Sequence, residues 1–109
     1  MESKVVSSKV DLDTSELAGV FSALSNPVRI DILRHIAQHR HCGCKDITEV
    51  LPLAQSTVSQ HLKVLIAAGI VTVESVPPRS RYQVNEDLVQ SMASSTRAFL
   101  NSCCGENCK

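Results

Sequence analysis

Residues 42–69, which read CGCKDITEVLPLAQSTVSQHLKVLIAAG, constrain the fold more than any other part of the chain. Their apolar spacing predicts a short helix over Asp46–Leu51, which stops at Pro52 because proline cannot continue a helix. A longer helix follows after a tight turn and ends at Gly69, a residue type common just past a helix. The inward positions of this longer helix are Val58, Leu62, Leu65 and Ile66. A short helix, a tight turn and a longer helix are the parts of a helix-turn-helix.

Two further helices are predicted before this motif. Asp13 followed by Glu16 has the pattern of a capping box, and apolar residues then recur at helical spacing. Asn26 is a good N-cap residue and Pro27 suits the first helical position, so a second helix is expected to start there. This second helix is expected to end in the polar stretch QHRH, residues 38–41.

A β-hairpin and a last helix are predicted after the motif. Residues 70–76 (IVTVESV) and 81–84 (RYQV) are rich in β-branched and aromatic side chains, and PPRS between them is expected to form the hairpin tip. Asn85 can cap a last helix that runs to Leu100. The predicted fold is therefore mainly α with a small β-hairpin, a winged helix-turn-helix with helices at both ends.

Size and composition agree with one small domain. The chain has 109 residues, of which 43% are hydrophobic, and a formal net charge of zero, which argues weakly against a nonspecific polyanion binder. We expect a flexible arm over residues 1–12, the domain over 13–101 and a cysteine-rich tail over 102–109. No signal peptide or membrane-spanning run is present, so a cytoplasmic protein without a membrane partner is expected. A domain this small could enlarge its core by forming a dimer.

The outer face of the longer helix is suited to reading DNA. Short hydrogen-bonding side chains and one cation can contact base edges and phosphates, whereas for the helix alone a plain solvated face is equally compatible. The candidate DNA-binding residues on this face are Gln55, Ser56, Thr57, Ser59, Gln60, His61 and Lys63. Arg79 and Arg81 in the hairpin, with Tyr82 beside them, are the candidates in the wing. His61 has two interpretations, a DNA contact or a buried histidine bonded within the turn.

Three motifs resemble the ArsR/SmtB family of metal-responsive repressors. They are ALSNPVRIDIL, LPLAQSTVSQHLKVLIAAGIV and RYQVN, and the resemblance extends over residues 14–100 or so. It implies a homodimer, built through the N- and C-terminal helices, that binds double-stranded operator DNA without a cofactor. It also implies that an inducer releases the dimer from the operator. A departure from many members is the wing tip, where Pro77 and Pro78 replace glycine.

The five cysteines are the candidate inducer site, because soft thiolates select thiophilic ions. Cys103, Cys104 and Cys108 resemble the cysteine set of arsenic-responsive members, which implies As(III) or Sb(III) as the inducer. Cys42 and Cys44 are secondary candidates, with a structural role as the equal alternative. The family's zinc site on the last helix is not expected, because that helix has Asp87 but no histidine.

Other roles for the tail cysteines stay open. The same thiols could bind another thiophilic metal such as Cu(I), respond to oxidation or persulfide, share a site with Cys42 and Cys44, or have no role. A thiol enzyme is disfavoured, because the tail follows a helix C-terminus, where the helix dipole destabilises a thiolate. No Cys-x-x-Cys pair on a βαβ unit is present either. A role outside enzymes is therefore predicted, and the resemblance to the ArsR/SmtB family implies a repressor of an arsenic-resistance type of operon.

Overall fold

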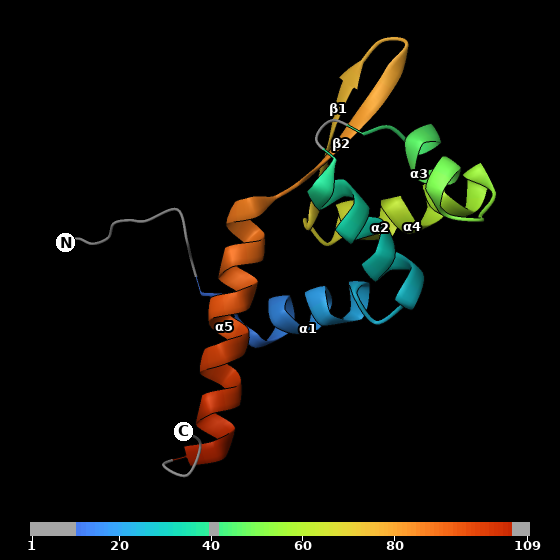
Figure 1. Cartoon of the computed structure of the whole chain (residues 1–109). Helices are drawn as coiled ribbons and strands as arrows, with labels where there is room; N and C mark the ends of the chain where they lie inside the picture. The colour runs from blue at the N-terminus through green and yellow to red at the C-terminus, as the bar shows by residue number, and fades with distance from the viewer. Residues whose placement is uncertain (1–10, 40–41, 106–109) are drawn as a thin grey trace.

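The computed structural model describes residues 11–39 and 42–105, and its elements follow the predicted order (Figure 1). The predictions for residues 1–10 and for Cys108 lie outside the described residues. The elements are α1 (Thr14–Ala23), α2 (Pro27–Gln38), α3 (Cys44–Val50), α4 (Gln55–Ala67), β1 (Val71–Val76), β2 (Arg79–Val84) and α5 (Glu86–Cys104). None of the helices in the described part of the chain is long and apolar enough to cross a bilayer.

The starts of α1 and α2 are confirmed. The Asp13 carboxylate accepts a 2.7 Å bond from the peptide nitrogen of Glu16, and the Glu16 carboxylate accepts a 2.9 Å bond from the nitrogen of Asp13. The Asn26 side chain accepts a 2.8 Å bond from the nitrogen of Val28, and Pro27 occupies the first turn of α2. These caps satisfy peptide donors that the first helical turn leaves without partners.

The predicted start of the short helix was wrong by two residues. Helix α3 begins at Cys44, with Gly43 as its N-cap residue. The Asp46 carboxylate reaches back and accepts a 2.8 Å bond from the peptide nitrogen of Gly43. Asp46 is therefore the third residue of the helix, not its first, and residues 51–54 form the turn before α4.

The core is aliphatic. Its buried side chains come from α1, α2, α3, α4 and the start of the wing, and half-buried apolar residues pack around them. The largest are Ile32, Ile47, Leu62, Leu65, Ile70, Val58 and Val71. Cys42 also belongs to this core and is 4% exposed.

The hairpin is an antiparallel pair in which Val71 lies opposite Val84 and Val76 opposite Arg79. The predicted tip PPRS was too long, because Arg79 and Ser80 pair with β1 and only Pro77 and Pro78 remain between the strands. The wing projects beyond the helices as a two-stranded arm (Figure 1).

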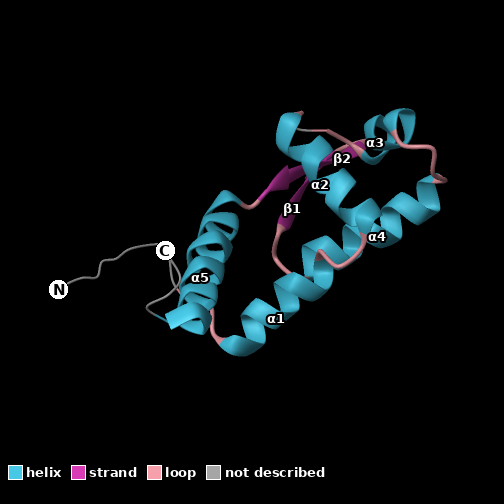
Figure 2. Cartoon of the chain, turned by 60° about the horizontal axis from the view of Figure 1, so that its bottom comes forward, coloured by secondary structure: helices cyan, strands magenta, loops and turns pink. Residues whose placement is uncertain are grey.

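Helix α5 leaves the wing and passes beside α1, as Figures 1 and 2 both show. Asn85 caps it by accepting a 3.3 Å bond from the nitrogen of Leu88, as predicted. The nitrogen of Leu12 donates a 2.9 Å bond to the Ser95 hydroxyl, so the expected flexible arm over 1–12 already contacts α5 at its last residue. The predicted end of this helix at Leu100 is wrong, whereas the expected bounds of the domain and tail stay a prediction. The helix continues to Cys104, because no helix breaker precedes Gly105, whose φ is 60°.

Candidate nucleic-acid interface and cysteine sites

Helix α4 divides into a buried side and a polar side. Val58, Leu62 and Leu65 are buried against the core. On the polar side, Gln55, Ser56, Gln60 and Lys63 are exposed, and Thr57, Ser59 and His61 are half-buried. The structure thus brings the predicted residues of this helix onto one accessible face, which carries donors, acceptors and one cation.

Arg29 of α2 lies within hydrogen-bonding distance of His61. The Arg29 Nε donates a 2.6 Å bond to the carbonyl oxygen of Ala23, and its Nη1 lies 3.4 Å from Nδ1 of His61. A guanidinium only donates hydrogen bonds, so Nδ1 of His61 must accept and the ring proton is on Nε2. This differs from the interpretation of His61 as a buried histidine bonded within the turn, because its ring is half-buried and its partner Arg29 lies in α2. The DNA contact of His61 stays a prediction.

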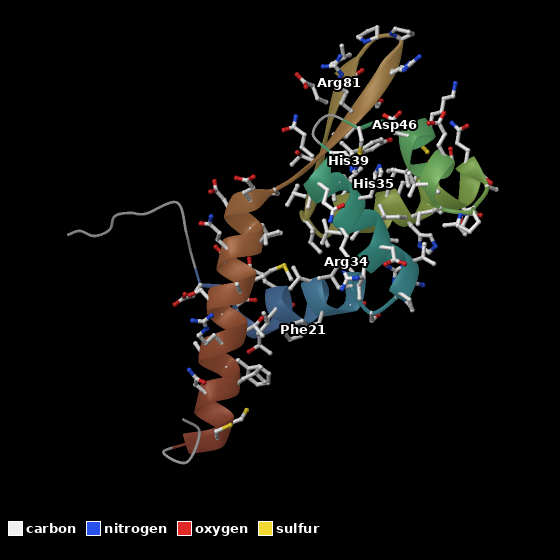
Figure 3. All side chains as sticks on the ribbon, viewed as in Figure 1. Phe21, Arg34, His35, His39, Asp46 and Arg81 are labelled. Atoms are coloured by element: carbon white, nitrogen blue, oxygen red, sulfur yellow. The ribbon has the colours of Figure 1, made fainter. Side chains whose placement is uncertain are left out.

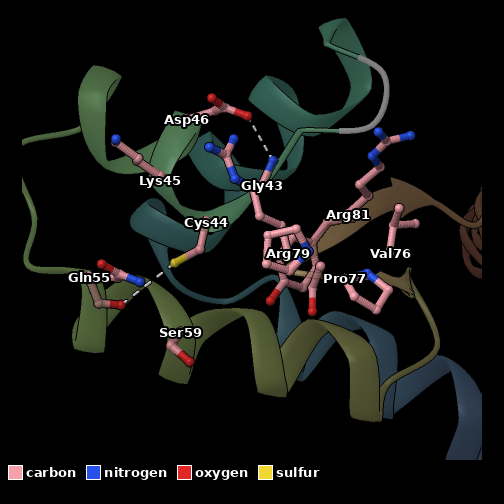
Figure 4. A pocket seen from close by; sticks show the side chains of 13 residues that line it. Gly43, Cys44, Lys45, Asp46, Gln55, Ser59, Val76, Pro77, Arg79 and Arg81 are labelled. Atoms are coloured by element: carbon pink, nitrogen blue, oxygen red, sulfur yellow. Dashed lines mark hydrogen bonds between the residues drawn. The ribbon is translucent and has the colours of Figure 1, made fainter.

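A cleft of about 870 Å³ separates the wing from the N-terminal ends of α3 and α4 (Figure 4). Its lining includes Gln55 and Ser59 from α4 and Arg79 and Arg81 from β2. Both arginines are exposed. The cleft is also lined by Lys45, a cation of α3 that is not among the predicted DNA-binding residues; the signal for it was its position in CGCKD, at the start of the helix-turn-helix. Three cations around one cleft suit a phosphate backbone.

Cys44 lines this cleft, and Cys42 is buried beside the wing. The carbonyl oxygen of Cys42 accepts a 2.8 Å bond from the peptide nitrogen of Tyr82, and the Cys44 Sγ lies 3.8 Å from the carbonyl oxygen of Gln55. Burial raises the pKa of the Cys42 thiol, with a further increase from the Asp46 charge, and burial raises the pKa of Cys44. Both thiols are therefore held in the protonated form, which is the poorer metal ligand.

Tyr82 is half-buried and packs against the core, so it is less accessible to DNA than the neighbouring arginines. Burial raises its pKa, and the nearby Cys44 and Cys42 raise it further. Its predicted DNA contact stays a prediction. Within residues 11–39 and 42–105, no group of three or more His, Cys, Asp or Glu side chains is arranged to hold a metal ion.

The other described cysteines are at the opposite end of the molecule. Cys103 and Cys104 are exposed and occupy the last turn of α5, far from α3 and the wing (Figure 1). Within one chain the structure therefore does not bring Cys103 or Cys104 together with Cys42 and Cys44. Cys104 is disulfide-bonded, so binding of a metalloid at this end requires the reduced chain.

Known proteins share both this architecture and this sequence. A family model described as a helix-turn-helix domain matches residues 24–74. An arsenical resistance operon repressor of Bacillus subtilis (strain 168) is 35% identical over 75 residues, which are 68% of this chain and 70% of the relative. The chain belongs to the ArsR/SmtB family of transcriptional regulators. Its relatives are regulators, which confirms the prediction that it is not an enzyme.

Solved structures confirm the winged helix-turn-helix fold of this ArsR/SmtB member. An ArsR-like transcriptional regulator from Rhodococcus sp. RHA1 has a TM-score of 0.68 at 27% identity, over 80% of this chain and 82% of that one. A protein of Mycobacterium bovis, described as a homodimeric winged helix-turn-helix DNA-binding domain, has a TM-score of 0.65 at 24% identity, over 83% of each chain. The family makes the exposed face of α4 and the wing the candidate DNA-binding surface.

Proposed function

We propose that this ArsR/SmtB regulator is a homodimeric repressor of an arsenic-resistance type of operon, and that As(III) or Sb(III) releases it from its operator. In this proposal Cys103, Cys104 and Cys108 supply three thiolates to the metalloid. The observation that carries it is the position of Cys103 and Cys104, which are neighbours on the exposed last turn of α5. Gly105 follows them with a positive φ of 60°, which lets the chain turn directly after the pair.

The DNA-binding half of the proposal rests on α4 and the wing. Gln55, Gln60 and Lys63 are exposed on α4, and Arg79 and Arg81 are exposed on the wing. Glutamine can pair with adenine through two hydrogen bonds, and arginine and lysine neutralise phosphates. A dimer would place two such helices in neighbouring major grooves of double-stranded DNA, about one helical turn apart.

The dimer rests on apolar side chains that one chain leaves exposed on α1 and α5. Phe21 of α1 is 40% exposed, and Phe99 and Leu100 of α5 are 46% and 52% exposed. These large side chains lie on helices that pass beside each other (Figures 1 and 2). A second copy covering them would remove apolar surface from water, which favours association. The structural neighbour from Mycobacterium bovis is homodimeric by its description.

The choice of inducer rests on thiol chemistry and on the name of the Bacillus subtilis relative. Soft thiolates select soft ions, and trivalent arsenic binds three sulfur atoms. Closing such a site at the end of α5 would change the same helix that carries Phe99 and Leu100. Inducer and operator binding would then be coupled through the dimer interface, typically by about 1–3 kcal/mol.

The test measures operator release by arsenite. Operator DNA selected from random sequence is labelled, bound by the reduced wild-type chain and titrated with arsenite while fluorescence anisotropy is followed. We expect wild type to release DNA and Cys103→Ser/Cys104→Ser to retain it, with equal DNA affinity in the absence of arsenite. Cys44→Ser is the matched thiol control and should respond as wild type does. If the double variant releases DNA at the wild-type arsenite concentration, the tail assignment is wrong.

A second candidate function is sensing of thiol oxidation by the same cysteines. The disulfide at Cys104 favours it, because an exposed cysteine that forms a disulfide can respond to an oxidant. The same anisotropy assay separates the two functions. Release by peroxide in the absence of metalloid, reversed by a reductant and lost in Cys104→Ser, would support oxidation as the signal.

A further inference from the structure

Two histidines lie one turn apart near the C-terminal end of α2, outside the sites described above. The rings of His35 and His39 are stacked, with centroids 4.2 Å apart and an interplanar angle of 22°. Residues four apart are neighbours on a helix surface, so both rings project from the same side of α2. Figure 3 shows them at the end of this helix that is nearer the wing.

A backbone hydrogen bond fixes the proton of one ring. Nδ1 of His39 lies 3.0 Å from the carbonyl oxygen of His35, which can only accept. Nδ1 of His39 must therefore carry the proton, and Nε2 keeps its lone pair. Histidines that bind metals in proteins commonly have this arrangement, in which the second ring nitrogen donates to a carbonyl or carboxylate.

The surroundings of the pair favour a bound cation. The last turn of a helix has a negative partial charge from its peptide carbonyls. The Asp46 carboxylate of α3 is close enough to act electrostatically on His35 and favours positive charge there.

We propose that His35 and His39 form a two-histidine chelate for a divalent transition-metal ion that favours imidazole, such as Zn²⁺, Ni²⁺ or Cu²⁺. Metal–nitrogen bonds of about 2.0–2.1 Å require the two donor nitrogens to be roughly 3 Å apart. The rings are stacked with centroids 4.2 Å apart, and imidazole lone pairs lie in the ring plane, so both rings must rotate out of the stack for their donor nitrogens to reach one ion. Water completes the coordination, because no third ligand is arranged for a metal within residues 11–39 and 42–105.

This site is independent of the proposed arsenite site. Cys103 and Cys104 lie at the far end of α5, whereas His35 and His39 lie at the end of α2, on the side of the molecule that carries the wing (Figure 1). A metal ion bound by both histidines would stabilise the last turn of α2. The chain reaches Cys42 soon afterwards, where the carbonyl oxygen is bonded to Tyr82 of the wing. A metal ion bound here would therefore lie close in the sequence to the hydrogen bond that joins Cys42 to Tyr82 of the wing.

The test uses the full chain in a Cys103→Ser/Cys104→Ser/Cys108→Ser background, which removes the tail thiols as competing ligands. Zn²⁺ is titrated in the presence of a reductant, and the histidine ring signals are followed by proton–nitrogen NMR. We expect the signals of His35 and His39 to shift together and to saturate at one Zn²⁺ per chain. His61, already bonded to Arg29, is the internal control and should not shift.

Two variants make the test specific. His39→Ala should weaken Zn²⁺ binding by at least about tenfold, since even loss of an outer partner of a metal ligand costs that much. Ala37→His/His39→Ala keeps the number of histidines but moves one to exposed position 37, where it no longer faces His35, and should bind as weakly. Unchanged affinity in either variant, or Zn²⁺ binding that leaves both ring signals in place, would overturn the proposal.

Discussion

The peptide nitrogen of Tyr82 donates a 2.8 Å hydrogen bond to the carbonyl oxygen of Cys42, which joins the segment before α3 to the second strand of the wing. Cys42, the first cysteine of the Cys-x-Cys pair with Cys44, therefore helps to position the wing through its backbone. Cys42 is 4% exposed, so its side chain is part of the core and not of an open thiol site. Of the two roles considered for Cys42, metal ligand or structural residue, its packing favours the structural one.

Alkylation should therefore distinguish the cysteines. In the folded, reduced chain we expect iodoacetamide to modify exposed Cys103 first, half-buried Cys44 more slowly and buried Cys42 last. Burial raises the pKa of Cys44 and Cys42, so at pH 8 fewer of these thiols are ionised than of an ordinary thiol. Mass spectrometry of digested samples, taken over time, gives the three rates. Equal rates for Cys42 and Cys103 would contradict this order.

The same pKa shifts predict how stability depends on pH. The folded chain keeps protons on Cys42 and Cys44 that the unfolded chain releases at the usual thiol pKa. The contribution of these two protonated thiols to the free energy of unfolding is fully present below the usual thiol pKa. It is lost as the pH rises through the raised pKa values of the folded chain. Urea unfolding from neutral to alkaline pH should show this loss, and Cys44→Ser should show less of it. A free energy of unfolding that rises over this range would contradict the expectation.

Much of the fold could be predicted because its signals are local. The capping residues Asp13, Asn26 and Asn85 act on peptide groups two or three residues away, and all three predictions are confirmed. The polar side of α4 was also predictable, because helical periodicity separates it from Val58, Leu62 and Leu65. The predicted end of α5 at Leu100 is too early, because the apolar pattern stops there but the helix continues to Cys104.

The relations that shape the candidate site could not be predicted, because they join residues far apart in the sequence. No local sequence pattern indicates that Cys42 is hydrogen-bonded to Tyr82, or that Arg29 is hydrogen-bonded to His61. The proximity of Asp46 to His35 depends in the same way on how α2 and α3 pack. A sequence pattern names such side chains, but their partners are set by tertiary packing.

Removing the arginines of the wing should weaken DNA binding in a salt-dependent way. Arg79→Ala and Arg81→Ala each remove an exposed cation beside the cleft. Each phosphate contact that is lost should reduce the slope of log affinity against log salt concentration by about 0.9. Fluorescence anisotropy at several salt concentrations measures this slope. Arg97→Ala, an exposed arginine on α5, is the matched control and should leave the slope unchanged. An unchanged slope in both wing variants would exclude phosphate contacts by these residues.

A charge at the end of α5 should separate the two chains of the proposed dimer. Phe99→Glu would place a carboxylate in an interface that is expected to be apolar, and an unpaired buried charge is costly. Light scattering after size-exclusion chromatography should show a monomer where wild type is a dimer. Gln90→Glu adds the same charge at an exposed position nearer the start of α5 and should stay dimeric. A dimeric Phe99→Glu protein would show that the interface lies elsewhere.

Asn85 should contribute to stability beyond its role as a cap, because its side chain bonds two elements. Its side chain accepts from the nitrogen of Leu88 at 3.3 Å and donates to the carbonyl oxygen of Gly69 at 2.9 Å, so it joins α5 to the end of α4. Asn85→Ala should lower the free energy of unfolding by about 2 kcal/mol, roughly half from the cap and half from the carbonyl left without its donor.

Two comparisons test whether this loss has the proposed cause. Asn85→Asp keeps the acceptor for the cap but cannot donate to Gly69, so it should recover only part of the stability. Asn101→Ala, at an exposed position of the same helix, should change the free energy of unfolding by less than about 0.5 kcal/mol. Urea unfolding followed by circular dichroism measures all four proteins. If Asn85→Ala unfolds at the same urea concentration as wild type, the two hydrogen bonds do not hold α5 against the end of α4, and another contact, such as that between Leu12 and Ser95, must orient the helix.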